Sequence, residues 1–142
     1  MLKRIDPRYR TAHLGKWHID EDPSRYGYDL HDGITKNKPG GFTQGNHKRQ
    51  WTGYAEKDPK RMESLTNRAI EFLRDSVTQD RPFFLQLSHY AVHSDIVFSD
   101  TSFDATSTRL RGSLHSNAGY AAMLEDLDDS IGVFLQFFEN SD

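Results

Sequence analysis

The fold is decided by residues 58–88, DPKRMESLTNRAIEFLRDSVTQDRPFFLQLS, which predict a helix followed by a buried strand. Asp58 offers an N-cap, and Pro59 suits the first helical position, where its missing N–H is not needed. Apolar residues then recur at helical spacing to about Asp75, namely Met62, Leu65, Ala69, Phe72 and Leu73. After the break at Pro82, the apolar run over 83–88 suits a strand buried on both faces of a parallel sheet. A helix leading into such a strand indicates an α/β fold.

The rest of the chain adds one strand and one helix to this pair. Residues 11–14 predict a short strand that ends at Gly15. The clearest helix has apolar residues at alternating spacings of 4 and 3, at Tyr120, Leu124, Leu127, Ile131, Phe134 and Phe138. The stretches 19–57 and 94–116 are polar and show no period, so we expect them to be irregular. Two strands do not make a stable parallel sheet, so we expect a central piece of a larger α/β domain, with an incomplete mixed or parallel sheet flanked by helices.

The composition excludes several classes of protein. With 18 Lys+Arg and 21 Asp+Glu in 142 residues, the formal net charge is −3, so no nucleic-acid partner is expected. No window holds the roughly 18 consecutive apolar residues of a membrane span, and no apolar run follows the first residues as in a signal peptide, so no membrane partner is expected. The absence of cysteine excludes a disulfide scaffold, a zinc–thiolate site and a cysteine nucleophile within these residues. The cellular compartment and the oligomeric state stay open.

Basic side chains follow both predicted strands. If the chain stays extended past residue 14, Lys16 and His18 project from the same face. His89 and His93 come directly after the second strand. Because ligands of open α/β sheets bind beyond the carboxyl ends of the strands, neighbouring strands would bring Lys16, His18 and His93 to one crevice suited to an anionic, tetrahedral ligand. The alternative is that the Lys-x-His pair is an ordinary surface feature and that His89 satisfies a hydrogen bond in the core.

An acidic run lies on the last predicted helix, at Glu125, Asp126, Asp128 and Asp129. A metal site would pair Glu125 with Asp128 or Asp129, which lie one helical turn further on. We favour the alternative that the acids take the solvated positions beside the buried apolar stripe. The chain contains no Gly-rich phosphate-binding loop and no Gly-x-Ser-x-Gly nucleophile motif. Nothing within these residues therefore offers an activated nucleophile.

Three segments resemble the sulfatase family, and they occur in the order that the family has. Residues 9–18, YRTAHLGKWH, resemble the second sulfatase signature, in which glycine, lysine, an aromatic residue and histidine follow in that order. Residues 82–93, PFFLQLSHYAVH, resemble the core strand that ends in the family's substrate histidine. Residues 120–132, YAAMLEDLDDSIG, are similar to the helix that follows this strand.

The resemblance implies a partial alkaline-phosphatase-like α/β fold that hydrolyses sulfate esters with a formylglycine nucleophile and a calcium ion, Ca²⁺. It assigns Lys16 to holding the sulfate and nucleophile oxygens, and His18 to serving as partner and base for the formylglycine hydrate. It assigns His93 to the ester side of the sulfate, where this residue helps to protonate the leaving oxygen. A sulfate monoester needs such groups, because negative charge moves onto the bridging oxygen as the bond breaks.

Parts of the family pattern do not occur in the chain. The Cys-x-Pro-x-Arg motif that is oxidised to formylglycine is absent, as are the Asp-Asn-Gly or Asp-His-Gly metal ligands expected after the last helix. We therefore expect residues 1–142 to be the central segment of a single catalytic domain, without nucleophile or metal ligands, inactive alone and poorly stable. The alternatives are a non-catalytic truncated remnant and a phosphate or phosphonate ester hydrolase of the same superfamily. Sulfate esters of sugars and of aryl alcohols are equally open as substrates.

Overall fold

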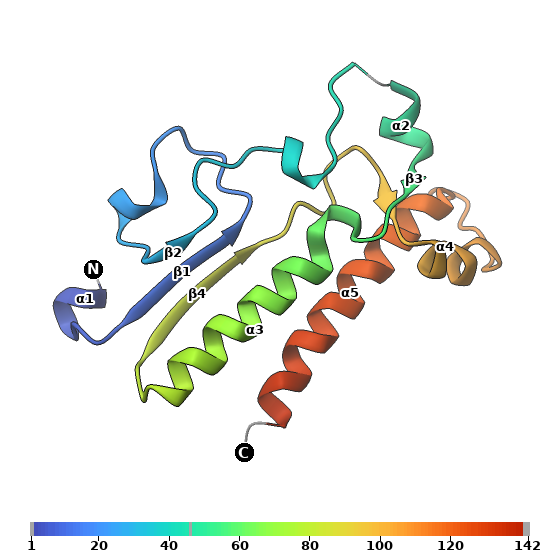
Figure 1. Ribbon diagram of the computed structural model, residues 1–142. Helices are drawn as coiled ribbons and strands as arrows, with labels where there is room; N and C mark the ends of the chain where they lie inside the picture. Colours follow the sequence, from blue (N-terminus) through green and yellow to red (C-terminus); the bar gives the residue numbers. More distant parts are fainter. Residues whose placement is uncertain (1, 46, 141–142) are drawn as a thin grey trace.

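The centre of the molecule is a three-stranded parallel sheet. The computed structural model describes residues 2–45 and 47–140. The strands lie in the order β2-β1-β4 and comprise Leu30–His31, Arg10–Gly15 and Phe83–Ser88 (Figure 1). β1 and β4 pair along their whole length, from Arg10 opposite Phe83 to Gly15 opposite Ser88. This pairing confirms that the two strands predicted from the sequence are neighbours.

Two helices, α3 (Met62–Thr78) and α5 (Ala118–Glu139), cover one face of the sheet. Both run in the direction opposite to β1 and β4 (Figure 1). Ala12 and Leu14 of β1, with Leu85 of β4, point to this face and form the core with the helices. The helix-covered parallel sheet confirms the predicted α/β class.

β4 is buried on one face only, so the prediction of a strand buried on both faces is wrong. Phe84 is 42% exposed and Gln86 is exposed as well. On this face the connection after β1 contributes Tyr28, whose ring lies against Phe84 and whose hydroxyl donates to Gln86. The expectation of two strands is also wrong, because the 19–57 stretch contains β2, which pairs with β1.

The α-helix of α3 begins three residues later than predicted. Pro59–Arg61 form a short 3-10 helix, η3, in which Lys60 and Arg61 have φ values of +54° and +56°. These left-handed residues cannot continue an α-helix, so α3 starts at Met62. Asp58 still caps it, because its Oδ1 accepts a hydrogen bond from the Glu63 amide at 2.9 Å. The predicted buried face is confirmed, with all five apolar residues below 4% exposed: Met62, Leu65, Ala69, Phe72 and Leu73.

α5 confirms the last predicted helix, but the predicted stripe is buried only in part, because Leu127 and Phe134 pack against the core and its other members do not. The residues of the predicted stripe that are about 40% exposed are Tyr120, Leu124, Ile131 and Phe138. Ala122, Met123 and Ser130 are buried instead. Small residues such as Ala122 allow α5 to approach its neighbours closely, which turns the bulkier stripe outward. The described chain therefore leaves an apolar stripe of α5 in solvent.

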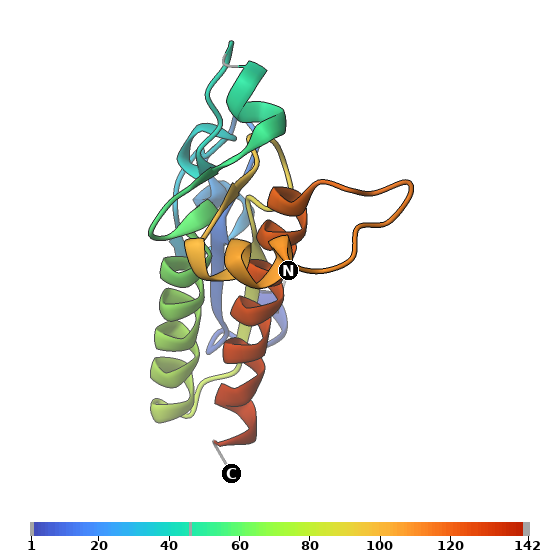
Figure 2. The same ribbon diagram turned by 90° about the vertical axis from the view of Figure 1, so that its right-hand side faces the viewer.

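The stretch 94–116 is partly regular, which corrects the expectation of an irregular segment. It contains β5 (Val97–Phe98) and α4 (Asp100–Ser107), and β5 pairs in parallel with β3 (Tyr54–Ala55). The connection from α4 to α5 then extends away from the sheet (Figure 2). The remaining elements are α1 (Leu2–Ile5), η1 (Pro23–Tyr26), η2 (Lys38–Gly40) and α2 (His47–Thr52). No helix among the described residues has the length and apolar character to cross a membrane.

One member of the acidic run holds α4 in place. Asp126 accepts hydrogen bonds from the Ser99 amide at 2.8 Å, from the Ser99 hydroxyl at 2.6 Å and from the Ser102 hydroxyl at 2.7 Å. Ser99 is also the N-cap of α4. The prediction that the whole acidic run is solvated is therefore wrong at Asp126, although Asp128 and Asp129 are exposed.

Candidate functional site

The carboxyl edge of the sheet, where β1 and β4 end side by side, carries the predicted site residues. The Lys16 amide donates a 2.8 Å hydrogen bond to the Ser88 carbonyl, so the two strands stay paired to their last residues. Gly15 makes this approach possible. Its φ is +96°, and a Cβ atom there would lie 2.1 Å from the Ser88 oxygen. The glycine of the signature thus brings the backbone of Lys16 directly beside the end of β4.

A single segment, residues 35–43 (the strap), binds the end of β1. The Thr35 hydroxyl donates to the Gly15 carbonyl at 2.6 Å and accepts from the Trp17 amide at 2.9 Å. The Thr35 carbonyl accepts from the His18 amide at 2.8 Å. His18 has a φ of +59°, so the chain does not stay extended and the predicted shared face of Lys16 and His18 is wrong. Lys16 is half-buried, whereas His18 is exposed.

The same strap reaches the end of β4 and fixes the ring of His93. Asn37 lies 3.2 Å from Nε2 of His93, and the Ser94 carbonyl lies 2.6 Å from Nδ1. A carbonyl oxygen only accepts, so Nδ1 carries the proton and Nε2 accepts from the Asn37 amide. The ring of Phe42 meets that of His93 edge-on at 5.6 Å. The strap therefore contacts both segments that the sequence singled out.

The strap also holds the chain directly after His93. The carboxylate Oδ2 of Asp95 accepts hydrogen bonds from the amide and the hydroxyl of Thr43. Asp95 is 1% exposed, and its other oxygen, Oδ1, is buried with no hydrogen-bond partner among the described residues. Sequence reasoning missed Thr35, Asn37 and Thr43. The available signal was the length of the 19–57 connection, since long irregular connections in compact domains are usually functional.

Two further histidines lie at this edge, of which His13 is buried and His89 is half-buried. His13 is 1% exposed, and its Nε2 lies 3.1 Å from the Ser88 hydroxyl. Burial lowers the pKa of His13, and burial also lowers the pKa of His89. Both imidazoles are therefore held neutral at pH 7, and the Nδ1 atom of each is buried without a partner in the described chain. His89 follows β4 as predicted, but it is not a cation facing the crevice.

Lys60 is a buried lysine that the sequence did not reveal. It is 2% exposed and lies in the left-handed turn before α3. Burial lowers its pKa from 10.5 to about 8, and the charge of Lys16 acts in the same direction. The carboxylates of Asp95 and Glu56 oppose this shift. A lysine after the N-terminal proline of a helix is ordinarily solvated, so the residue pattern gives no sign of its burial.

The described residues do not fit a calcium site. Residues 2–45 and 47–140 contain no group of three or more histidine, aspartate or glutamate side chains that could hold a metal ion. The acidic run does not form such a group, because Asp126 binds Ser99 and Ser102 and Glu125 pairs with Arg109. No step of the chemistry proposed below is therefore assigned to a metal held by this chain.

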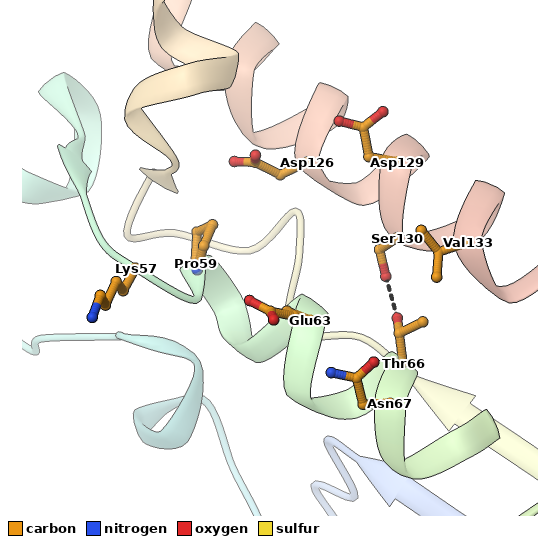
Figure 3. A pocket seen from close by; sticks show the side chains of 9 residues that line it. All are labelled: Lys57, Pro59, Glu63, Thr66, Asn67, Asp126, Asp129, Ser130 and Val133. Atoms are coloured by element: carbon orange, nitrogen blue, oxygen red, sulfur yellow. Dashed lines mark hydrogen bonds between the residues drawn. The ribbon is translucent and has the colours of Figure 1, made fainter. Parts of the chain in front are cut away.

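A cleft between α3 and α5 is separate from the carboxyl edge. Its volume is about 240 Å³, and its walls include the carboxylates of Glu63, Asp126 and Asp129 (Figure 3). The Thr66 and Ser130 hydroxyls form a hydrogen bond across its floor. None of Lys16, His18 and His93 lines this cleft. Its negative charge disfavours an anionic ligand.

Comparisons with known proteins agree with this architecture. The family model described as Sulfatase matches residues 3–142. The crystal structure of Ps i-CgsB has a TM-score of 0.67 and 20% sequence identity, and the match covers 96% of this chain and 35% of that one. The same values hold for Ps i-CgsB in complex with k-i-k-neocarrahexaose. No curated protein matches the chain. This chain is thus similar in fold to about a third of the neighbour's length, and it belongs to the sulfatase family.

Proposed function

We propose that this chain supplies the anion-binding part of a sulfuric ester hydrolase. The observation that carries the proposal is that Lys16 directly follows β1, His93 lies five residues after the adjacent strand β4, and one strap binds both segments. A sulfate ester carries negative charge on its outer oxygens and gains more on the bridging oxygen as the bond breaks. A cation at one strand end and an imidazole at the other meet these two needs.

In this proposal Lys16 binds the outer sulfate oxygens and His93 serves the leaving oxygen. Nε2 of His93 accepts from Asn37 in the structure, so the leaving oxygen must take the place of that amide at Nε2. The Ser94 carbonyl keeps a proton on Nδ1. Nε2 must therefore first take up a proton from solvent, and the imidazolium then gives that proton to the leaving oxygen and returns to the neutral ring. His18, which is exposed beside the crevice, is proposed to act on the nucleophile as its partner and base.

The nucleophile and the metal ion of the proposed enzyme are not supplied by these residues. The sulfatase resemblance implies a formylglycine, which would supply the nucleophile, and a calcium ion, which would supply positive charge beside the sulfate. Both would be contributed by chain outside 1–142. What the described residues contribute is the fixed cation, the proton-carrying imidazole and the backbone that orients them.

The substrate is proposed to be a sulfate ester rather than a phosphate ester, because the family model that matches the chain is Sulfatase. One structural neighbour was crystallised with a neocarrahexaose, which makes a sugar sulfate the first substrate to test beside an aryl sulfate.

The test uses the complete protein that contains these residues. Release of inorganic sulfate from a sugar sulfate and an aryl sulfate is measured beside release of phosphate from the matched phosphate esters. We expect sulfate release that His93→Ala reduces and that Asp128→Ala, on the exposed face of α5, leaves unchanged. Faster phosphate release would favour the phosphatase alternative, and no release of either anion would favour the non-catalytic remnant.

A further inference from the structure

Lys60 has a charge that the described chain does not pair. Its side chain is 2% exposed, which makes it the largest of the fully buried side chains. The described residues offer it neither a carboxylate within 4.0 Å nor a hydrogen-bond acceptor. Burying a lysine side chain to this extent disfavours its charged form, and a nearby counter-charge would offset that cost.

The turn that carries Lys60 lies at the carboxyl edge of the sheet. η3 contacts both η2, which belongs to the strap, and β5, which begins two residues after Asp95. In Figure 1 the start of α3 is at the same end of the molecule as the tips of β1 and β4. The charges that act on the Lys60 ammonium include that of Lys16. The turn that carries Lys60 therefore lies near the predicted anion site.

The backbone holds the Lys60 side chain inward. Lys60 and Arg61 both have left-handed φ values, a conformation that costs a non-glycine residue about 1–2 kcal/mol. A regular helical turn after Pro59 would avoid this cost. In the observed turn the Lys60 side chain is buried, and the turn itself contacts the strap.

The nearest buried carboxylate is only partly available to Lys60. Asp95 directs Oδ2 to Thr43 and leaves Oδ1 without a hydrogen-bond partner in the described chain. If Asp95 were the dedicated partner of Lys60, we would expect an ion pair between them, and none within 4.0 Å is present among the described residues. Lys16 and Lys60 repel each other, and an anion bound between them would relieve that repulsion.

We propose that Lys60 is a second cation of the anion site and binds a tetrahedral oxyanion together with Lys16. The inference rests on the proposed function, because it adds a residue to the same sulfate site. A sulfate group presents several oxygens at once, so two lysines on different elements can each contact one of them. In this arrangement the fold keeps Lys60 buried because the substrate is its counter-charge.

The test measures binding of inorganic sulfate to the complete protein by isothermal titration calorimetry, at an ionic strength held constant with sodium chloride. We expect Lys60→Met and Lys16→Ala each to weaken sulfate binding at least fivefold. Lys57→Met is the matched control, because Lys57 lies three residues earlier and is exposed, and it should stay within twofold of the wild type.

The outcomes separate this inference from the proposed function. If Lys16→Ala weakens binding and a folded Lys60→Met protein does not, the inference about Lys60 is overturned while the sulfate site stands. If the wild type binds sulfate no better than chloride, both are overturned.

A second measurement needs no variant and so remains decisive if Lys60→Met fails to fold. The wild-type protein is acetylated at pH 8 with and without sulfate, and modification of each lysine is followed by mass spectrometry. Sulfate should slow acetylation of Lys60 at least fivefold and leave Lys57 unaffected. Equal rates at Lys60 with and without sulfate would contradict the proposal.

Discussion

At the carboxyl edge of the sheet, buried polar atoms lack partners, whereas between α3 and α5 the buried hydroxyls are paired. The unpartnered atoms among the described residues all lie at that edge: Nδ1 of His13 and His89, Oδ1 of Asn37, and Oδ1 of Asp95. In the helix pair, Thr66 bonds to Ser130, and the Ser76 hydroxyl donates to the Phe72 carbonyl at 2.7 Å. Within residues 2–45 and 47–140, buried polar atoms without hydrogen-bond partners therefore occur at the carboxyl edge and not between α3 and α5.

This difference separates the part of the chain that we propose to bind a ligand from the part that stabilises the fold. Each buried polar group without a partner costs about 1–3 kcal/mol of stability, so a fold keeps several of them together where a ligand or further chain satisfies them. The helix pair has no such groups in the described chain, and its side chains stabilise the fold by packing on the sheet. Substitutions in the two regions should therefore change different measured quantities.

The largest effect is expected from the site residues in the complete enzyme. Replacing Lys16, His18 or His93 with alanine should lower turnover roughly 100-fold or more, the scale for losing one electrostatic or acid–base group. The melting temperature should change by only a few degrees, since none of the three side chains belongs to the core. Initial rates and thermal melts measure the two quantities.

Asp128→Ala is the control for this experiment, and neither its rate nor its melting temperature should change much. A loss of activity in Asp128→Ala with full activity in Lys16→Ala would move the functional site to the acidic run.

The reverse pattern is expected in the helix pair. Leu65 is 2% exposed and packs against Leu14 and Tyr90, so Leu65→Ala should lower the free energy of unfolding by about 2–5 kcal/mol. Urea unfolding of the complete protein measures this change. Val77→Ala, at a position of the same helix that is 60% exposed, should stay within about 0.5 kcal/mol of the wild type. Equal losses in the two variants would show that α3 does not anchor the core.

Lys60 should make the free energy of unfolding increase with pH in the alkaline range. Its pKa is lowered to about 8 in the fold and is 10.5 without it, so the unfolded chain binds more protons between these two values. Burying the charged lysine destabilises the fold fully below pH 8, and this destabilisation disappears as the pH rises to 10.5. Wild-type stability should therefore rise relative to Lys60→Met by on the order of 1–3 kcal/mol across this window.

Urea unfolding of both proteins at pH 7, 9 and 10.5 tests this dependence. The difference in unfolding free energy between Lys57→Met and the wild type should be the same at all three pH values. A constant difference between wild type and Lys60→Met would mean that Lys60 is not buried as described.

The last predicted effect concerns the hydrogen bond between the Thr66 and Ser130 hydroxyls and its contribution to the unfolding free energy. Thr66→Val alone leaves the buried Ser130 hydroxyl without that partner and should cost about 1–3 kcal/mol. Adding Ser130→Ala removes both polar groups, so the double variant should be less destabilised than the sum of the single variants. A double-mutant cycle in urea measures the coupling, and strict additivity would argue against the hydrogen bond.

Sequence reasoning identified the elements whose signals are local. The apolar run over 83–88 and the short run before Gly15 indicated the paired strands, and the spacing of residues from Met62 to Leu73 indicated the correct face of α3. β2 was missed because two residues are too few to show the alternation of apolar and polar side chains that marks a strand. It is a strand only because it pairs with β1. α4 was missed because its serines and threonines are typical of a loop, and its position depends on Asp126, 27 residues after Ser99.

The positions of two proposed site residues could be predicted for the same reason. Lys16 and His93 follow strands that pattern alone could place, and the register of β1 and β4 brought those strand ends together. The turn at His18 and the burial of Lys60 depend on left-handed backbone conformations that are uncommon outside glycine. Asn37 lies 56 residues from His93, and nothing local in the sequence connects them.

The strap makes the two strand ends one cooperative unit for local opening. The amides of Trp17 and His18 are held by Thr35, and the Thr43 amide is held by Asp95. A fluctuation that lifts the strap exposes these three amides to solvent in the same event, so they should share one opening free energy in hydrogen exchange. The segment with Lys16 after β1 and the segment with His93 after β4 then open and close together. A ligand that binds either segment should slow the opening of both.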